Sequence, residues 1–394
     1  MMAIVLPEAV EFIIKRLADF GYKAHIVGGP VRDHIRGVLP DDYDITTSAL
    51  PEEVKRVFAD IRVIDTGIKH GTVTLLINGV GYEVTTYRID GEYKDARRPE
   101  SVEFTSDITQ DLSRRDFTVN AIAYNPEEGF VDPFGGAEDI SKGIIRAVGR
   151  AEKRFSEDAL RILRGIRFSA TLGFSVEEQT SLAIFEKKEL LKKVSAERIY
   201  TEWRKLLSGR CSASVFDEYR EVIGVFLPEI SEAKIIDTDG FASADYNCRL
   251  LALFALCGRT GEEFAEAMKR LKTDSDTREN GRVALENYCS VGEWSRSDIG
   301  RLLYRVGAER AMLTARLAVL LGKAPLEGVA LVEEYLRSGA EYRVSDLRVG
   351  GKDLLEAGLC GKQIGATLER LLLSVIDGRL VNDRQALLAS AKEG

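Results

Sequence analysis

Cysteine, histidine and tryptophan are scarce: the 394 residues include five cysteines, three histidines and two tryptophans. The cysteines form no Cys-x-x-Cys pair, which argues against a zinc cluster and against a disulfide framework. We therefore expect free thiols in a reducing cytosol. His25, His34 and His70 form no spaced pair, and no His-Asp dipeptide occurs. Metal ligation by histidine and a metal phosphohydrolase domain of the His-Asp type are thus not expected.

Long apolar runs are missing as well. The most apolar stretch, residues 311–332, is interrupted by Arg316, Lys323 and Glu327, so we expect no membrane span. The segment before Pro7 is too short for a signal peptide. A cytoplasmic protein without a membrane partner is the expectation, and the sequence leaves open whether it is a monomer or a homodimer.

Composition and charge are those of a globular chain. Apolar residues make up 45% and charged residues 30% of the sequence, which is ordinary for globular proteins. A chain of 394 residues has room for two to four domains. The formal net charge of -8 argues against indiscriminate nucleic-acid binding. It permits a local basic surface, which is what the docking of a phosphate backbone requires.

The pattern of expected elements changes near residue 150. Before it, helix and strand signals are mixed, with a helix over 8–20, strands over 23–27, 62–64, 72–77 and 82–87, and Asn78-Gly79 as a hairpin turn. After it, the pattern is helical nearly throughout. One helix is expected over 157–173, capped by Ser156 and ended by Gly173. Further helices are expected over 177–194, 196–207, 248–256, 261–271, 297–306, 309–321, 327–338, 352–357 and 361–377.

Two glycines follow the predicted strand 23–27, in the run Val27-Gly28-Gly29-Pro30-Val31-Arg32-Asp33. Glycines let a backbone approach a ligand closely, and Pro30 suits the first turn of a helix. The N–H groups of such a turn, with Arg32 beside them, make an anion site. A plain turn is the alternative interpretation.

Asp42 and Asp44 lie two residues apart, which places both on one side of an extended segment. Two adjacent carboxylates repel each other unless a cation lies between them, and hard oxygen ligands suit magnesium. A solvated loop is the alternative. Glu83, on the predicted strand 82–87, is a weaker candidate for a third carboxylate, and an exposed strand residue is the better interpretation.

The run Arg114-Arg115-Asp116 precedes an apolar stretch. It is either a solvated charge run at a helix start, or a guanidinium and carboxylate set that holds a ribose hydroxyl and a phosphate. Between these motifs, the charged segment 88–99 has only weak periodicity. It is either a functional mobile loop or a plain connector.

A third cluster begins at Glu157-Asp158. On one helix, Asp158 and Arg161 are one turn apart, and Arg164 and Arg167 continue that ridge in steps of three. The simple interpretation is an exposed ladder of ion pairs. The functional one is base selection: a carboxylate only accepts hydrogen bonds and a guanidinium only donates. Such a pair fits the amino group and ring nitrogen of cytosine or adenine and rejects guanine and uracil, by roughly 10⁴-fold or more.

In this order, the motifs resemble those of the class II tRNA nucleotidyltransferases, the bacterial CCA-adding enzymes, whose nearest relatives are bacterial poly(A) polymerases. The resemblance covers most of the chain. It rests on GGPVRD, DDYDITT, RRPESVEF, RRDFTVNAIAYN, VDPFGG, EDALRILRGIRF and AERIYTEWRKLL, and on a Gram-positive type of tail from Val349. It implies an α+β protein with a polymerase-β-like nucleotidyltransferase head (1–148), a helical neck (149–210), a helical body (211–300) and a helical tail (301–394).

The resemblance also implies roles for residues. Asp42 and Asp44 would be catalytic and would hold two magnesium ions. The nucleotide-binding residues would be Gly29 and Arg32 on phosphates, Arg114, Arg115 and Asp116 on the ribose, Glu157, Asp158 and Arg161 as an amino-acid template for the base, and Arg164 and Arg167 as further arginines at the nucleotide. The segment 90–99 matches a flexible loop associated with the switch from C to A addition. Candidate tRNA phosphate contacts are Arg146, Arg150, Lys153, Arg154, Lys269, Arg270, Lys272, Arg301 and Arg305.

The implied activity is template-independent addition of C, C and A to the 3′ end of tRNA, from CTP and ATP. Three alternatives stay open: a poly(A) polymerase, an enzyme that adds only the terminal A, and a catalytically inactive RNA-binding relative. A dinucleotide-binding oxidoreductase is a distant alternative, because no G-x-G-x-x-G follows the first strand.

Overall fold

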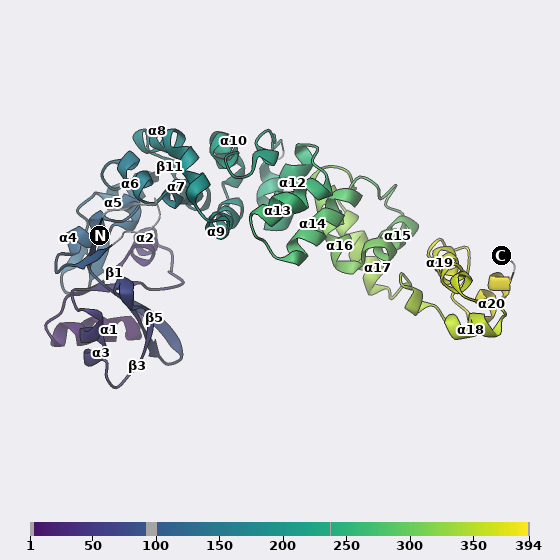
Figure 1. Ribbon diagram of the computed structural model, residues 1–394, viewed down its shortest axis with the longest axis horizontal. Helices are drawn as coiled ribbons and strands as arrows, with labels where there is room; N and C mark the ends of the chain where they lie inside the picture. The colour runs from purple at the N-terminus through teal and green to yellow at the C-terminus, as the bar shows by residue number, and fades with distance from the viewer. Residues whose placement is uncertain (1–3, 92–100, 237, 393–394) are drawn as a thin grey trace. The chain divides into compact units, whose positions relative to one another are not determined.

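The computed structural model describes residues 4–91, 101–236 and 238–392, and the chain divides into two units, Met1–Phe226 and Leu227–Gly394 (Figure 1). The first unit combines a β-sheet with helices. The second unit is helical over its described residues. The predicted α+β class, with a sheet-bearing N-terminal part and a helical remainder, is confirmed.

The first unit begins with a sheet and short helices and ends in longer helices. Its elements are α1 Glu8–Asp19, β1 Ala24–Val27, α2 Gly29–Ile35, β2 Ile45–Thr47, α3 Pro51–Val57, β3 Arg62–Gly67, β4 Thr72–Ile77, β5 Val80–Thr86, β6 Arg88–Asp90, β7 Val102–Phe104, α4 Ile108–Ser113, β8 Ala123–Asn125, β9 Gly129–Val131, α5 Gly136–Lys142, β10 Ile144–Ile145, α6 Ala151–Glu157, α7 Leu160–Leu172, β11 Ser175–Val176, α8 Glu178–Lys187, α9 Ala196–Leu207 and α10 Ser212–Ile223.

The main sheet has seven strands in the order β3-β4-β5-β2-β1-β8-β9. β1 pairs antiparallel with β2 and β8, and β2 runs parallel to β5. The backbone N–H of Val27, at the end of β1, donates to the carbonyl oxygen of Asp44, just before β2 (3.1 Å). This pairing brings the glycine turn after β1 next to the Asp42–Asp44 segment.

The hairpin predicted at Asn78-Gly79 is confirmed. Both residues have positive φ, 51° and 81°, as the tight turns of hairpins require. β4 has the predicted bounds, and β5 begins two residues before its predicted start. The remaining prediction for this region, segment 90–99, lies largely outside the described residues, which end at 91 and resume at 101. Its described flanks, β6 and β7, pair antiparallel.

The helix predicted over 157–173 is wrong at its start. Two helices, α6 and α7, occupy this region, and Asp158 lies between them with an extended backbone (φ -135°, ψ 106°). Ser156 caps no helix: it lies inside α6, where its hydroxyl donates to the carbonyl oxygen of Glu152. The predicted end is confirmed, because Gly173 ends α7 in the left-handed conformation (φ 73°) that glycine adopts at low cost.

The second unit contains more helices than the sequence predicts. Its elements are α11 Thr238–Ser243, α12 Tyr246–Leu256, α13 Gly261–Arg270, α14 Ser275–Asn287, α15 Arg296–Val306, α16 Ala308–Leu320, α17 Gly328–Arg337, α18 Gly351–Glu356, α19 Lys362–Ile376 and α20 Arg384–Lys392. α14 was not predicted, because its sequence is mainly polar and contains a glycine. Asp274 caps it by accepting from the backbone N–H of Thr277 (2.7 Å).

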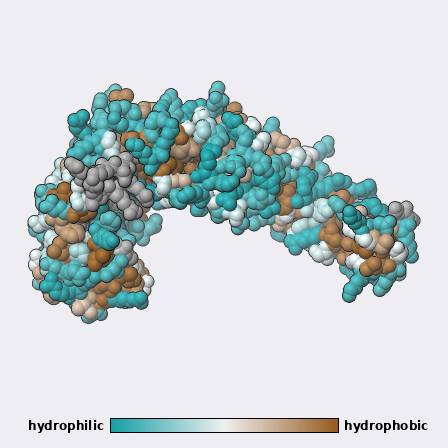
Figure 2. Space-filling view, in the orientation of Figure 1, coloured by the Kyte–Doolittle hydropathy of each residue, from teal (hydrophilic) through white to brown (hydrophobic). Residues whose placement is uncertain are grey.

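Apolar side chains form separate cores along the second unit. One cluster joins α15, α16 and α17 around Trp294, Leu302 and Tyr335. Another joins α18, α19 and α20 around Leu354 and Leu371. Hydrophilic residues cover most of the visible face of each unit (Figure 2). Over the described residues, no helix is both long and apolar enough to cross a membrane. All five cysteines are free, as predicted.

Candidate functional site

The turn between β1 and α2 has the geometry that its glycines suggest. β1 is buried along its whole length, and Gly28 follows it with a φ of 80°. A Cβ on Gly28 would lie 3.2 Å from Nη1 of Arg115, so a larger residue would also press on that guanidinium. Gly29 begins α2, and Pro30 lies in its first turn. The predicted strand, glycine turn and helix start are all present.

Asp44 lies in an environment that favours its neutral form. Partial desolvation by the surrounding protein is the largest cause of its raised pKa, and the charge of Asp42 is the next. The charge of Arg115 works in the opposite direction, while Glu83 adds to the rise. Glu83 is exposed, as the sequence favours, but it is near enough to act on Asp44. A cation beside these carboxylates would relieve their repulsion.

The donor set near Asp44 suits magnesium. Among the residues that the structure describes, no group of three or more His, Cys, Asp and Glu side chains is arranged to hold a metal ion. Magnesium is commonly held by one or two carboxylates, with water and substrate phosphates as the other ligands. The pair Asp42 and Asp44 therefore fits a magnesium ion that arrives with a triphosphate.

Arg32 is buried on α2 and points to several partners. Its Nη1 donates to Oδ1 of Asn120 (2.8 Å), and its Nε and Nη2 donate to the carboxylate of Asp33 (3.0 and 2.8 Å). Its guanidinium carbon lies 5.5 Å from the ring centroid of Phe168 on α7. Arg32 thus contacts both the sheet region and the helical end of the first unit in a fixed geometry.

Arg114 and Arg115 share one buried carboxylate. Asp111 on α4 lies 2.7 Å from Nη2 of Arg114 and 3.5 Å from Nη2 of Arg115, and it is fully buried. The solvated charge run considered above is therefore wrong, and so is its place at a helix start. The two arginines follow the end of α4, and both side chains are largely covered.

Asp116 forms a buried ion pair with Arg164 of α7. Oδ2 of Asp116 lies 2.7 Å from Nη2 of Arg164, and Oδ1 accepts from the backbone N–H of Phe117. Burial alone would raise the pKa of Asp116, but the charge of Arg164 and these hydrogen bonds lower it to about 2. The same pair raises the pKa of Arg164. This pair connects the Arg-Arg-Asp run to the helix that carries the third cluster.

The low pKa of Asp116 predicts an acid-sensitive contribution to stability. A carboxyl with a pKa of about 2 in the folded chain and an ordinary value of 3.8 contributes about 2 kcal/mol to the free energy of unfolding. Because the folded pKa is depressed, that contribution is complete above about pH 4 and is lost as the pH falls through about 2.

Denaturant titrations of an Asp116→Asn variant at several pH values measure this contribution. We expect the variant to be less stable than the natural chain by about 2 kcal/mol at pH 6, and the difference to shrink towards pH 2. Asp217→Asn is the matched control, since that carboxylate has an exposed arginine partner, Arg220, and such pairs contribute about 0–1 kcal/mol. A difference for Asp116→Asn that does not change with pH would contradict the assignment.

Asp158 and Arg161 do not form the exposed ladder of ion pairs that was the simple interpretation of their spacing. Asp158 accepts from the backbone N–H of Leu160 and pairs with Nη2 of Arg198 on α9 (3.0 Å). Arg161 is buried instead of solvated, and its Nη1 pairs with Glu157 (2.9 Å). Asp158 belongs to neither helix, so the assumed shared ridge with Arg161 is wrong, while both residues still lie beside the turn between α6 and α7.

Arg161 also links the third cluster to the second. Its Nη2 donates to the carbonyl oxygen of Arg114 (2.8 Å). Glu157 accepts from Arg154 as well (2.8 Å). Three of the five N–H donors of Arg161 are thus bonded to described residues, two of them from Nη1 and one from Nη2.

Glu202 on α9 is a charged site residue to which the sequence analysis assigned no role. It is buried, it lies 2.6 Å from Nε of Arg167, and it lies 3.9 Å from Nη1 of Arg164. Arg198 lies one turn before it on the same helix. The spacing of four between Arg198 and Glu202 is the signal that was available, but only the packing of α9 on α7 shows that both face the third cluster.

The predicted site residues thus form one chain of charges within the first unit. Asp44 and Arg115 interact, and Arg115 interacts in turn with Asp116. Asp116 pairs with Arg164, which also feels the charge of Asp158. The acidic pair, the Arg-Arg-Asp run and the third cluster therefore lie near one another in the first unit.

A basic groove opens beside this site. Its volume is about 980 Å³, and all of its lining comes from the first unit. Six lysines and arginines and three aspartates line it. The full lining is Arg32, Asp33, Arg36, Val38, Leu39, Asp41, Asp42, Arg167, Thr171, Leu172, Tyr200, Thr201, Arg204, Lys205, Ser208, Gly209 and Arg210. Its excess of positive charge suits a polyphosphate or an RNA backbone.

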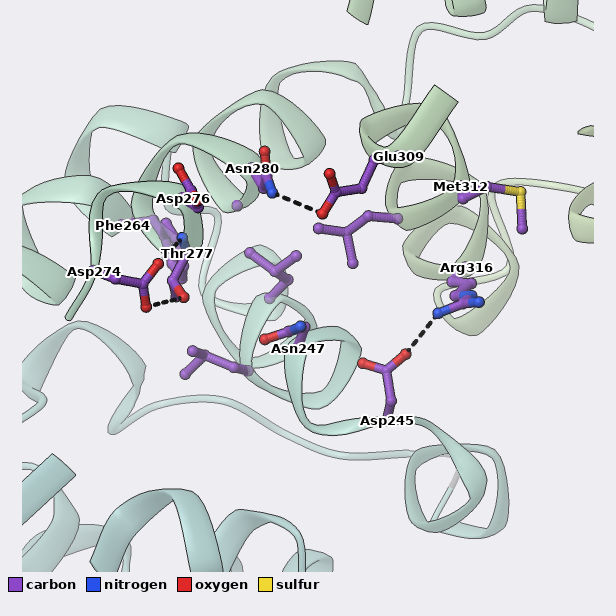
Figure 3. A pocket seen from close by; sticks show the side chains of 14 residues that line it. Asp245, Asn247, Phe264, Asp274, Asp276, Thr277, Asn280, Glu309, Met312 and Arg316 are labelled. Carbon is purple, nitrogen blue, oxygen red and sulfur yellow. Dashed lines mark hydrogen bonds and ion pairs between the residues drawn. The ribbon is translucent and has the colours of Figure 1, made fainter. Parts of the chain in front are cut away.

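The second unit contains a smaller cavity of about 350 Å³, between α12, α13, α14 and α16 (Figure 3). Its charge is of the opposite sign, with four carboxylates and one guanidinium. Asp245 pairs with Arg316 (3.2 Å), and Glu309 accepts from Asn280 (3.2 Å). These carboxylates disfavour a polyphosphate, so the groove of the first unit is the better candidate for binding one. The carboxylates are Asp245, Asp274, Asp276 and Glu309.

Comparison with known proteins agrees with this geometry. Three family models match successive parts of the chain: the poly A polymerase head domain matches residues 24–146, the probable RNA and SrmB-binding site of polymerase A matches 173–234, and the putative tRNA nucleotidyltransferase domain 2 matches 247–391. A CCA-adding enzyme of Lactobacillus delbrueckii subsp. bulgaricus is 37% identical over 383 residues, which are 95% of each chain. This chain belongs to the CCA-adding enzyme family.

Solved structures of the family have the same fold. The CCA-adding enzyme of Bacillus stearothermophilus in complex with CTP is 32% identical, with a TM-score of 0.83 over 98% of this chain and 96% of that one. The Thermotoga maritima CCA-adding enzyme complexed with tRNA is 21% identical, with a TM-score of 0.70 over 98% of this chain and 95% of that one. The predicted resemblance to this family of nucleotidyltransferases is confirmed.

Proposed function

We propose that this chain adds C, C and A to the 3′ end of tRNA, using CTP and ATP. The family supports the reaction, since relatives that match nearly the whole chain are CCA-adding enzymes. The observation that carries the proposal is the chain of charges from Asp44 through Arg115 and Asp116 to Arg164. A nucleotide bound along it would have its triphosphate at the acidic pair and its base at the turn between α6 and α7.

Asp42 and Asp44 are the proposed catalytic residues and metal ligands. Enzymes of this family use divalent metal ions, and we propose two magnesium ions here. When bound, such ions lower the pKa of the attacking 3′-hydroxyl and neutralise the developing charge on pyrophosphate. The carboxylates of Asp42 and Asp44 would hold these ions, and the raised pKa of Asp44 means that a cation beside it would stabilise its charged form.

The phosphates and the ribose are assigned to the first two motifs. Gly29 begins α2. The N–H groups of this first helical turn, with Arg32 beside them, would suit an anion such as a phosphate. Arg114, Arg115 and Asp116 would hold the ribose and an adjacent phosphate. Asp111 fixes both guanidiniums, so little side-chain entropy is lost when the nucleotide binds.

Asp158 and Arg161 are the proposed base-selecting pair. Arg198 orients the carboxylate of Asp158, and Glu157 orients the guanidinium of Arg161. Two N–H donors of Arg161 remain beyond its three bonds to described residues. A base with an amino group and a ring-nitrogen acceptor fits this pair, which favours cytosine and adenine over uracil and guanine.

The part of the groove that α9 lines is the proposed path of the tRNA 3′ end. Arg204 and Lys205 lie in the last turn of α9 and line its wall, together with Tyr200. Cations in this place suit a phosphate backbone, and an aromatic side chain can stack on a base. Of the candidate phosphate contacts elsewhere, Arg301 already pairs with Asp377 (2.7 Å). The division into head (1–148), neck (149–210), body (211–300) and tail (301–394) also remains a proposal.

Incorporation of labelled CTP into a tRNA that lacks its CCA end tests the proposal. We expect incorporation with magnesium, and its loss when a chelator is added in excess. Binding of the tRNA without incorporation under any divalent cation would contradict the proposal and would indicate an inactive RNA-binding relative.

A further inference from the structure

One aromatic ring lies beneath three of the arginines in this site. The guanidinium carbons of Arg32, Arg164 and Arg167 lie 5.5, 5.3 and 3.7 Å from the ring centroid of Phe168. Arg32 comes from α2, and the other two come from α7, the helix of Phe168 itself. Phe168 is buried, and its ring meets Phe117 edge-on (5.9 Å between centroids, 78° between planes). Phe117 therefore helps to fix the position of the Phe168 ring, and the three guanidiniums lie around that ring.

Three guanidiniums around one ring repel one another, so their close placement requires contacts that offset this repulsion. Each has its own carboxylate, which reduces the repulsion: Arg32 with Asp33 (2.8 Å), Arg164 with Asp116 (2.7 Å) and Arg167 with Glu202 (2.6 Å). These carboxylates come from three different segments: α2, the connection after α4, and α9. The ring of Phe168 contacts all three guanidiniums. The negative face of an aromatic ring attracts a cation within about 6 Å.

We propose that Phe168 is a positioning residue for the triphosphate: it holds these three guanidiniums in one array beside the basic groove. Arg32 and Arg167 line that groove, and Arg164 lies one turn before Arg167 on α7. An aliphatic side chain would fill the same space without attracting a cation, so the array would lose its fixed spacing. This inference rests on the proposed nucleotidyl transfer, and it assigns the phosphate end of the nucleotide to a surface that spans α2 and α7.

The experiment compares Phe168→Leu with Phe168→Tyr in the full-length protein. The tyrosine keeps the ring, and the leucine removes it. We measure kcat, the KM for CTP, the KM for tRNA, and the affinity for magnesium pyrophosphate by calorimetry, which needs no turnover. For Phe168→Leu we expect the KM for CTP and the Kd for pyrophosphate to rise about five- to tenfold, with the KM for tRNA within about twofold. Phe168→Tyr should stay within about twofold in every quantity.

Phe216→Leu is the matched control, because Phe216 is a fully buried phenylalanine of α10 in the same unit. It should lower the melting temperature as Phe168→Leu does and leave the Kd for pyrophosphate unchanged. If Phe168→Leu does not fold, Phe168→Met replaces it, since methionine conserves more of the volume. Unchanged pyrophosphate affinity in the folded leucine or methionine variant, or an equal loss in the tyrosine variant, would overturn the inference. A natural chain that fails to incorporate CTP would instead overturn the proposed function.

Discussion

Incorporation of CTP by an Asp44→Asn variant is expected to fall by roughly 10³-fold or more, with little change in stability. A metal ion contributes several kcal/mol of charge stabilisation in the transition state, and about 4 kcal/mol corresponds to a thousandfold in rate. Asparagine keeps the size of the side chain but removes the charge that would hold the cation. Partial desolvation and Asp42 already raise the pKa of Asp44, so the neutral side chain relieves a repulsion in the absence of metal.

The same loss is expected for Asp42→Asn, and the neighbouring Asp41 provides the control. Asp41 and Asp42 both line the groove, so Asp41→Asn makes the same change of charge at the adjacent position. If the loss at Asp42 and Asp44 comes from metal ligation, Asp41→Asn should keep the rate of CTP incorporation within about threefold of the natural chain. Single-turnover rates at saturating CTP and tRNA are the measurement. Retained activity in Asp42→Asn or Asp44→Asn, or an equal loss in Asp41→Asn, would defeat the assignment of the metal ligands.

The second large effect concerns which base is accepted. If Asp158 and Arg161 select the base, exchanging them for side chains of reversed hydrogen-bond polarity should weaken the rejection of UTP by about 10²-fold or more. The wrong base leaves buried polar groups unpaired in the natural chain, which is the basis of discriminations of up to roughly 10⁴-fold. Side chains of reversed polarity would pair with uracil, so the free-energy penalty for unpaired polar groups would be lost.

The measurement is the ratio of kcat/KM for CTP to that for UTP, on one tRNA that lacks CCA. A double variant, Asp158→Lys with Arg161→Glu, should lower this ratio strongly, whereas Arg150→Gln should not change it. Arg150 is an exposed cation just before α6, and it has a distant carboxylate partner in Glu152 (4.0 Å). Because the double variant also breaks the pairs with Arg198 and Glu157, milder single variants, Asp158→Asn and Arg161→Gln, accompany it. An unchanged ratio in all folded variants would exclude the template.

Local signals were sufficient for much of the fold. Asn78-Gly79 fixed the β4–β5 hairpin because the turn needs positive φ at both positions. α9 runs over the predicted residues 196–207, since its apolar positions repeat with helical spacing. α14 was missed because its sequence is mainly polar, and its few apolar positions do not mark a helical face. The structure of the second unit therefore depends on packing that single-segment patterns do not show.

The error at Asp158 has a physical cause that the spacing concealed. Asp158, Arg161, Arg164 and Arg167 recur every third residue, which imitates one helical ridge. The backbone leaves the helical conformation at Asp158, and its carboxylate accepts from the backbone N–H of Leu160, the first residue of α7. The role of Glu202 could not be predicted either, because it pairs with arginines of α7 across the packing of two helices. Charge pairs of this kind appear only once the elements are placed together. Asp111 differs, since its spacing of three and four from Arg114 and Arg115 was a signal present in the sequence.

The products made from a tRNA that lacks its CCA end test the central claim most directly. With CTP alone we expect two added nucleotides, with ATP alone none, and with both nucleotides three followed by a stop. Long tails from ATP would instead indicate a poly(A) polymerase. A single A, added only to a tRNA that already ends in CC, would indicate an enzyme restricted to the last step, and either product pattern would contradict the proposed addition of C, C and A.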